Sequence, residues 1–295
     1  MSRVTGQPAI YWTNKGSLGI SFFLTEELMN TSVDSHLSCG AKKHKGGNVM
    51  RRKFMSMALT AAMVLSMAAT PVFAEDTASD EGFNLNLCIA SEPQTIDPAL
   101  NSAVDGAIMC NHMFEGLVKW VNDGEGNAVT APGQAESWEK TENEDGTVTY
   151  TVKLRDGIKW SDGQAVTAGD FVYAWQRLAN PETAADYCYM IDMVKGYDAI
   201  ADGSADPSTL GITAVDDQTL QIDLTYDCPY FEEIMAFPAT FPVRQDMVES
   251  SDNWTFDPST YIGNGPYKMT EWSHNAYISM EKNENYYDYE NLGPD

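Results

Sequence analysis

Residues 155–177 read Arg155-Asp-Gly-Ile-Lys-Trp-Ser-Asp-Gly-Gln-Ala-Val-Thr-Ala-Gly-Asp-Phe-Val-Tyr-Ala-Trp-Gln-Arg177 and join two polar turns to an amphipathic helix. Thr167 is the expected N-cap of this helix, and Asp170 can accept the free amides of its first turn and complement the helix dipole. An apolar stripe follows at Phe171, Val172, Trp175 and Leu178. Such a stripe favours core packing over a ligand surface. The run contains no reactive side-chain pattern, so it predicts a scaffold for binding before it suggests catalysis.

Strands are predicted on both sides of this helix, where apolar and polar residues alternate. The alternating segments are 83–89, 147–154, 212–215, 220–224, 268–272 and 277–281. Further helices are expected over 103–117 and 230–237, and Asn180-Pro181 is expected to end the central helix. Because the strands lie in hairpins instead of alternating regularly with helices, the expected fold class is α+β (mixed α/β).

An export signal is predicted over residues 50–74. Met50-Arg51-Arg52-Lys53 is a basic start, the following residues up to position 69 carry no charge, and small or compact residues end the run at Ala74. These parts are typical of a secretory signal peptide, and no Cys follows the cleavage point to carry a lipid. We interpret residues 1–49 as a disordered upstream extension or an over-extended start, and residues 75–82 as a flexible lead-in.

The chain that follows the signal is strongly acidic. Eight of the 18 Lys and Arg lie at or before Lys53 and leave 10, whereas only three of the 43 acids do and leave 40, so the net charge after position 74 is −30. Such a surface repels nucleic acid and anionic lipid head groups. Acidity by itself names no ligand, and it is also typical of a soluble exported protein.

No metal, cofactor or catalytic site is expected. The turn cluster 122–127 lacks the spacing and the terminal Glu of a calcium loop, so a hairpin turn is predicted there. His112 and His274 are the only histidines after position 74, and motifs such as G-x-S-x-G and H-E-x-x-H are absent. The cysteines after position 74 are Cys88, Cys110, Cys188 and Cys228, without a C-x-x-C pair. Their pairing in an oxidising compartment stays open.

Six short motifs follow one another from residue 91 onward. They are Ser91-Glu-Pro-x-x-Ile-Asp-Pro98, Phe114-Glu-Gly-Leu117, Ala131-Pro-Gly-x-Ala-Glu-Ser-Trp138, the run 155–175, Pro229-Tyr-Phe231 and Gly263-x-Gly-Pro-Tyr267. Together they closely resemble the extracytoplasmic solute-binding proteins of family 5, which are the oligopeptide- and dipeptide-binding receptors of ABC importers. The resemblance covers residues 83–295 in collinear order.

The resemblance implies a periplasmic-binding-protein-like fold of type II, in which two lobes close around a peptide by a hinge motion. Residues 83–114 plus 245–295 resemble the discontinuous first domain, lobe I, and residues 115–244 resemble a small inserted domain II. The further lobe of the family has no counterpart before residue 295, so lobe I is expected to be incomplete and the C-terminal lobe missing. In the family, that lobe supplies the acid that pairs with the peptide's amino terminus.

The resemblance also implies ligand-binding residues. Ser102, Ala103 and Val104 match the stretch whose backbone lines the peptide, whereas Tyr187 and Phe237 match pocket-side positions on the small domain. Judged from the residues alone, Val104 and Phe237 are also compatible with core packing, and Tyr187 with a surface position at a helix end. No catalytic residue and no metal ligand is carried over.

The function implied is the substrate-binding component of an ABC-type peptide import system. It would act as a monomer in the periplasm or at the outer face of the cytoplasmic membrane, with a peptide as ligand, a membrane permease as partner and no nucleic acid. Two alternatives stay open: a receptor of the same family for nickel, haem or oligosaccharide, and a truncated remnant that binds nothing. An enzyme is not expected.

Overall fold

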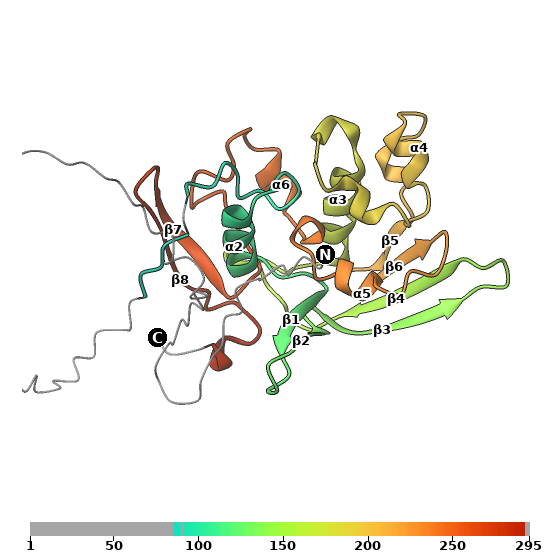
Figure 1. The fold of residues 1–295 in the computed structure, drawn as a ribbon, viewed down its shortest axis with the longest axis horizontal. Helices are drawn as coiled ribbons and strands as arrows, with labels where there is room; N and C mark the ends of the chain where they lie inside the picture. The colour runs from blue at the N-terminus through green and yellow to red at the C-terminus, as the bar shows by residue number, and fades with distance from the viewer. Residues whose placement is uncertain (1–84, 90, 293–295) are drawn as a thin grey trace, which may run out of the picture. The chain divides into compact units, whose positions relative to one another are not determined.

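The computed structural model of the protein describes residues 85–89 and 91–292 (Figure 1). The chain divides into two compact units, Met1–Glu81 and Gly82–Asp295, and the described residues belong to the second. The predicted upstream extension, signal peptide and lead-in, which end at residue 82, lie outside the described residues. Among the described helices, none combines the length and the apolarity that crossing a bilayer requires.

The strands of the described residues form antiparallel sheets (Figure 1). The largest sheet has the order β3-β4-β6-β5, with β3 at Ala135–Glu142, β4 at Val148–Leu154, β5 at Ile212–Asp216 and β6 at Thr219–Leu224. Two-stranded sheets pair β1 (Val118–Asn122) with β2 (Ala128–Pro132) and β7 (Tyr267–Ser273) with β8 (Tyr277–Lys282). The strands predicted between residues 147 and 281 are confirmed, and the predicted turn 122–127 joins β1 to β2.

Helices connect and cover these strands. The α-helices are α2 (Val104–Met113), α3 (Ala168–Ala179), α4 (Tyr197–Ala201), α5 (Phe231–Ile234) and α6 (Gln245–Val248). Single turns of 3-10 helix are η1 (Pro181–Thr183), η2 (Cys188–Ile191), η3 (Pro207–Thr209), η4 (Pro238–Thr240) and η5 (Tyr289–Asn291). α3 contacts β5, α4, α6 and four of the 3-10 turns, so it is the element around which the neighbouring segments gather.

The helix α3 begins where the sequence predicts and buries the predicted stripe. Asp170 accepts the backbone N–H of Thr167 at 2.8 Å and completes a capping box. The completely buried side chains of the stripe are Phe171, Trp175 and Leu178, and Val172 is partly buried. Trp175 donates its indole N–H to the carbonyl of Thr240 at 2.9 Å, so its one polar atom is satisfied inside the core. The interpretation of the stripe as core is therefore confirmed.

The strand predicted over 83–89 is not formed in its described part. Residues 85–89 have no strand conformation, and the side chains of Leu85 and Leu87 are 48% and 58% exposed. A strand needs a neighbouring strand to accept and donate its backbone hydrogen bonds. None of the described strands pairs with this segment. Alternation of side chains alone therefore did not make a strand here.

The helix predicted over 103–117 ends early, at Met113. Phe114 takes an extended conformation with φ −128° and ψ 162°. The side chain of Asn264 accepts the N–H of Glu115 at 3.0 Å and donates to the carbonyl of Glu115 at 2.9 Å. The backbone of Glu115 is thus bonded to a distant loop instead of to the helix. The prediction was wrong at this end, because the spacing of apolar residues gives no information on hydrogen bonds to a residue as distant in the sequence as Asn264.

The helix predicted over 230–237 is also shorter, since α5 covers Phe231–Ile234 only. The hydroxyl of Thr240 donates to the carbonyls of Ile234 and Phe237 at 2.9 and 2.8 Å. Carbonyls at a helix end need such partners once helical bonding stops. The side chain of Thr240 therefore caps the turn that leads into η4.

Two glycines of the Gly263-x-Gly-Pro-Tyr267 motif let this loop approach the end of α2. A Cβ atom on Gly263 would lie 1.9 Å from the carbonyl oxygen of Met113, and one on Gly265 would lie 2.6 Å from the backbone nitrogen of Phe114. Both distances are far below van der Waals contact, so only glycine fits. The motif is explained by close contact between backbones.

A buried polar network surrounds the carboxylate of Glu115. Gln134 donates to one carboxylate oxygen at 3.2 Å, and the hydroxyl of Tyr286 donates to the other at 2.5 Å. The Lys119 ammonium lies 3.5 Å from the same oxygen as Tyr286. Burial alone would lower the pKa of Lys119, but Glu115 and the hydroxyl of Tyr287 outweigh it and raise that pKa. Gln134 also donates to the carbonyl of Asn264 at 3.4 Å, so the network links residues of three separate motifs and a segment that follows β8.

A second buried ion pair ties the loop 91–98 to α3. Arg177 donates to both oxygens of Asp97, at 2.9 and 2.7 Å, and Asp97 is only 2% exposed. The backbone N–H of Ala99 and the indole N–H of Trp254 donate to the same carboxylate at 3.0 and 3.3 Å. A buried, bidentate pair with additional donors is among the strong polar contacts of a protein.

We predict that Arg177→Met destabilises the protein by about 3–5 kcal/mol, because it leaves Asp97 buried without its counter-ion. Urea unfolding followed by circular dichroism measures the loss. Lys153→Met is the matched control: Lys153 pairs with Glu136 at 2.9 Å, but both side chains are more than half exposed. Its cost should stay below about 1 kcal/mol. Equal costs for the two variants would contradict the assignment of the Asp97 pair as a buried bridge.

The four cysteines of the described residues are all unpaired. Cys88 is exposed, Cys188 is partly buried, and Cys110 and Cys228 are buried. Burial, and then the charge of Asp97, raise the pKa of the Cys110 thiol. A buried thiol with a raised pKa is inert, because only the thiolate attacks.

We therefore predict different reactivities for Cys88 and Cys110 toward a thiol reagent such as dithionitrobenzoate at pH 8. Cys88→Ser should lower the number of thiols that react fast in the native protein by one. Cys110→Ser should leave the fast reaction unchanged and remove one equivalent only after denaturation. Fast labelling of Cys110 in the native protein, read by mass spectrometry, would show that its site is open to solvent.

Candidate ligand-binding surface

The segment Ser102–Val104 lies on the surface at the start of α2. All three residues are exposed, and Val104 is 79% exposed, so the alternative of a core position for Val104 is excluded. Ala103 is the N-cap of α2 and has the extended angles φ −119° and ψ 153°. An exposed, extended backbone is a surface with which another extended chain can form main-chain hydrogen bonds.

Tyr187 and Phe237 form a ring pair, although they are 50 positions apart in the sequence. Their ring centroids are 5.2 Å apart and their planes are inclined by 84°, which is the edge-to-face arrangement that aromatic rings favour. Both residues are partly buried; Tyr187 immediately precedes η2, and Phe237 immediately precedes η4. The pair packs as a unit and keeps part of its surface accessible.

The segment Ser102–Val104 and the ring pair of Tyr187 and Phe237 adjoin elements that contact one another. α2 contacts η4, which follows Phe237, and α3 contacts both η2 and η4. The five residues predicted from the sequence therefore come from three segments: η2 and η4 both contact α3, and α2 contacts η4. Hereafter the candidate surface means Ser102–Val104 with Tyr187 and Phe237.

Two exposed apolar residues beside the candidate surface were missed by the sequence reasoning. Tyr189 is 55% exposed, and its ring centroid lies 6.1 Å from that of Tyr187. Leu100 is 37% exposed and lines a hollow of about 350 Å³, together with Asp97, Arg177 and other residues. Tyr189 lies in the single turn η2 and Leu100 in a turn, and segments this short carry no periodic signal in the spacing of apolar residues.

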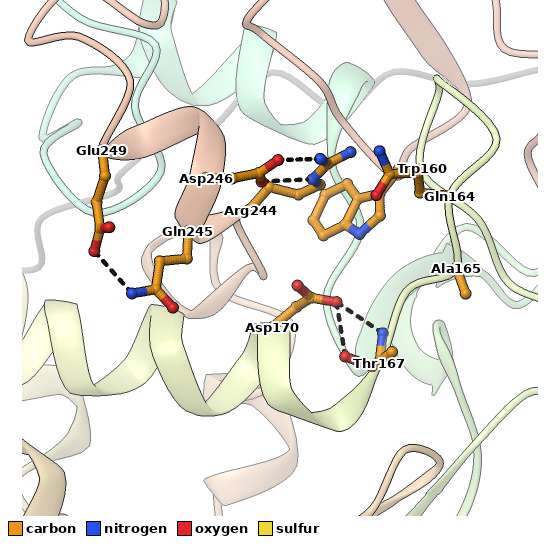
Figure 2. Close-up of a pocket in the computed structure, with 9 residues that line it drawn as sticks. All are labelled: Trp160, Gln164, Ala165, Thr167, Asp170, Arg244, Gln245, Asp246 and Glu249. Atoms are coloured by element: carbon orange, nitrogen blue, oxygen red, sulfur yellow. Dashed lines mark hydrogen bonds and ion pairs between the residues drawn. The ribbon is translucent and has the colours of Figure 1, made fainter.

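A larger polar hollow of about 470 Å³ lies between the start of α3 and α6 (Figure 2). The guanidinium of Arg244 donates to Asp246 and to Asp162, so its charge is neutralised inside the protein. Burial raises the pKa of Asp170, although its bonds to Thr167 act in the opposite direction. The polar groups that Figure 2 draws bond mainly to one another, and none of the predicted ligand-binding residues lines this hollow.

The two histidines after position 74 have different neighbours. His112 Nδ1 lies 2.7 Å from the carbonyl of Ile108, within its own helix. His274 Nδ1 lies 3.0 Å from the carboxylate of Glu92, which also accepts the indole N–H of Trp272 at 2.9 Å. Across the part of the chain that the structure describes, no three His, Cys, Asp or Glu side chains gather as a metal site would require.

Comparison with known proteins identifies the family. Residues 130–294 match the profile described as bacterial extracellular solute-binding proteins, family 5 Middle. The chain is 36% identical over 206 residues to the oligopeptide-binding protein OppA of Bacillus subtilis. The aligned residues are 69% of this chain and 36% of that protein. It is also 36% identical over 235 residues to the probable deoxycholate-binding periplasmic protein YgiS of Escherichia coli, covering 77% of this chain and 42% of that protein.

A solved structure agrees in fold. The crystal structure of Haemophilus influenzae OppA in complex with the peptide RPPGFSPFR superimposes with a TM-score of 0.62 at 37% identity, over 68% of this chain and 38% of that chain. The chain thus has the fold of an extracytoplasmic binding protein of type II, as predicted. It belongs to family 5 of the bacterial extracellular solute-binding proteins. It spans well under half the length of these relatives.

We predict that Tyr187 and Phe237 are energetically coupled. Tyr187→Ala and Phe237→Ala should each destabilise the protein, and the double variant should lose about 0.5–1.5 kcal/mol less than the sum, because the ring contact is lost only once. Urea unfolding of the four proteins gives the coupling. Tyr277, which is 51% exposed on β8, provides the control cycle with Tyr187 and should be additive. Additive effects of Tyr187 and Phe237 would contradict the ring pair.

Proposed function

We propose that the protein is the substrate-binding component of an ABC-type peptide import system and captures oligopeptides outside the cytoplasmic membrane. The observation that carries the proposal is the exposed, extended segment Ser102–Val104. This segment occurs in a chain that is 36% identical to an oligopeptide-binding protein and 37% identical to one whose structure contains a bound peptide.

The chemistry of the candidate surface suits a peptide. Peptide amides that leave water need hydrogen-bond partners, because an unpaired buried amide is costly. The backbone of Ser102–Val104 offers partners that do not depend on the peptide's side chains. The rings of Tyr187 and Phe237 offer apolar contact for a side chain. Main-chain bonds give affinity and side-chain contacts give preference, as in other proteins that bind extended peptides.

The proposal includes an organisation and a location. Residues 83–114 plus 245–295 would belong to lobe I and residues 115–244 to the inserted domain II, with closure of lobes around the ligand as the binding step. The signal at 50–74 would export the protein, which would act as a monomer with a membrane permease as partner. We assign no catalytic residue and no cofactor, and the negative charge after position 74 supports the absence of a nucleic-acid partner.

A steroid acid is the second candidate ligand, because one relative at 36% identity is described as a probable deoxycholate-binding protein. A largely apolar ring system would contact Tyr187 and Phe237. It has no peptide amides, so it would leave the backbone of Ser102–Val104 without main-chain partners. The two ligand classes therefore predict different roles for the two parts of the candidate surface.

Isothermal titration calorimetry tests the proposal with the full chain and a pool of di-, tri- and pentapeptides, beside deoxycholate. We expect heat from the peptides only, and we expect Tyr187→Ala to weaken their binding at least about tenfold, or about 1.4 kcal/mol. Tyr277→Ala, which removes a tyrosine on β8 away from the candidate surface, should leave the affinity unchanged. Binding of deoxycholate instead, or of none of these ligands, would contradict the proposal.

A further inference from the structure

We propose that Asn101 is a positioning residue of the candidate surface: its side chain fixes Ser102–Val104 so that the carbonyl of Ser102 and the N–H of Val104 face outward for an extended peptide. Asn101 itself would not touch the ligand, because it is only 6% exposed. The inference rests on the proposed function for the identity of the ligand. Its structural part, the fixed orientation of the backbone, can be tested without any ligand.

The side-chain amide of Asn101 bonds to both backbone groups of Ala103. Its oxygen accepts the N–H of Ala103 at 3.3 Å, and its nitrogen donates to the carbonyl of Ala103 at 3.0 Å. The donor and the acceptor of the amide are therefore both used on one residue. Such a two-way bond constrains the backbone on both sides of Ala103, unlike a single capping bond.

This constraint decides which backbone groups point to solvent. The N–H and C=O of one residue in an extended segment point to the same side, and those of its neighbours point to the other side. Ala103 is extended and turned toward Asn101, and across the trans peptide bonds on either side of it the carbonyl of Ser102 and the N–H of Val104 point the opposite way. Within residues 85–89 and 91–292, neither the carbonyl of Ser102 nor the N–H of Val104 has a hydrogen-bond partner.

The position of Asn101 is itself fixed by its surroundings. Its backbone N–H donates to the carbonyl of Asp97 at 2.9 Å, and Asp97 is held by Arg177. Gly106 leaves room for the side chain, since a Cβ atom there would lie 2.0 Å from the side-chain oxygen of Asn101. Asn101 is thus held in place by the Asp97 bridge on one side and by the missing side chain of Gly106 on the other.

The groups that Asn101 orients define the ligand chemistry. One acceptor and one donor, both uncharged, match one amide N–H and one carbonyl of a peptide backbone in extended conformation. Such bonds do not depend on the identity of the peptide's side chains. A peptide should therefore bind here through its main chain, and methylation of the amide nitrogen that donates to Ser102 should abolish that bond.

The test compares Asn101→Ala with Asn111→Ala. Asn111 is the matched control because it is exposed on α2 and its side chain also bonds to a backbone carbonyl, that of Ala107 at 2.8 Å. Amide hydrogen exchange gives the first readout. In the native chain we expect the N–H of Ala103 to be protected and that of Val104 to exchange fast. Asn101→Ala should raise the exchange rate of the Ala103 N–H at least about tenfold, because this N–H loses its acceptor. Asn111→Ala should leave that rate unchanged.

Peptide affinity gives the second readout. Asn101→Ala should weaken the binding of a pentapeptide at least about tenfold, and a peptide that is methylated at the bonded amide should bind the native chain and Asn101→Ala equally weakly. Asn101→Asp keeps the acceptor for Ala103 but loses the donor, so its affinity should lie between those of the native chain and Asn101→Ala. This graded series separates positioning from a general loss of fold.

The outcomes are distinguishable. An unchanged exchange rate of the Ala103 N–H in Asn101→Ala would overturn the role of Asn101. A faster exchange rate with unchanged peptide affinity would overturn it as well. If Asn101→Ala fails to fold, Asn101→Asp takes its place, because it loses only the donor to the carbonyl of Ala103, and unchanged peptide affinity of this variant would overturn the role of Asn101. Absence of peptide binding by the native chain would instead contradict the proposed function and leave the exchange result to decide the structural part.

Discussion

The buried carboxylate of Glu115 needs hydrogen-bond donors, and its two hydrogen-bond donors come from distant parts of the chain, beside the ammonium of Lys119 four residues away. Gln134 reaches it from the connection between β2 and β3, and Tyr286 from the segment after β8. Asn264 meanwhile takes both backbone groups of Glu115, which ends α2 and brings the loop of Gly263 and Gly265 against it. Removal of one donor would leave a buried carboxylate oxygen with fewer partners, so these elements depend on one another.

The buried carboxylate of Asp97 also needs donors, and the loop that carries it leads to the candidate surface. Arg177 neutralises Asp97 and thereby fixes the loop that leads to Asn101 and to Ser102–Val104. The exposed segment Ser102–Val104 is thus tied to buried groups through Asn101. The hollow in Figure 2 shows the contrast, because there Arg244 and its carboxylate partners satisfy one another.

Much of the fold could be read from the sequence, because it depends on contacts between near neighbours. Thr167 and Asp170 marked the start of α3, and turn residues marked the hairpins. The predictions were wrong at residues 85–89, where a strand has no partner among those described, and at Glu115, where a distant side chain ends a helix. Of the candidate surface, family motifs supplied the residues. Asn101 was not singled out, although an Asn side chain commonly bonds to the backbone two residues further on, as this one does at Ala103.

The run 155–177 by itself determined a capped helix with a buried stripe, since capping and amphipathic spacing act within a few residues. The motifs around it determined the family. Only the tertiary structure decided which polar groups are buried and paired, and so which backbone groups near Val104 have no partner among the described residues. That decision belongs to the folded state because a buried polar group takes its partners from whatever segments packing brings to it.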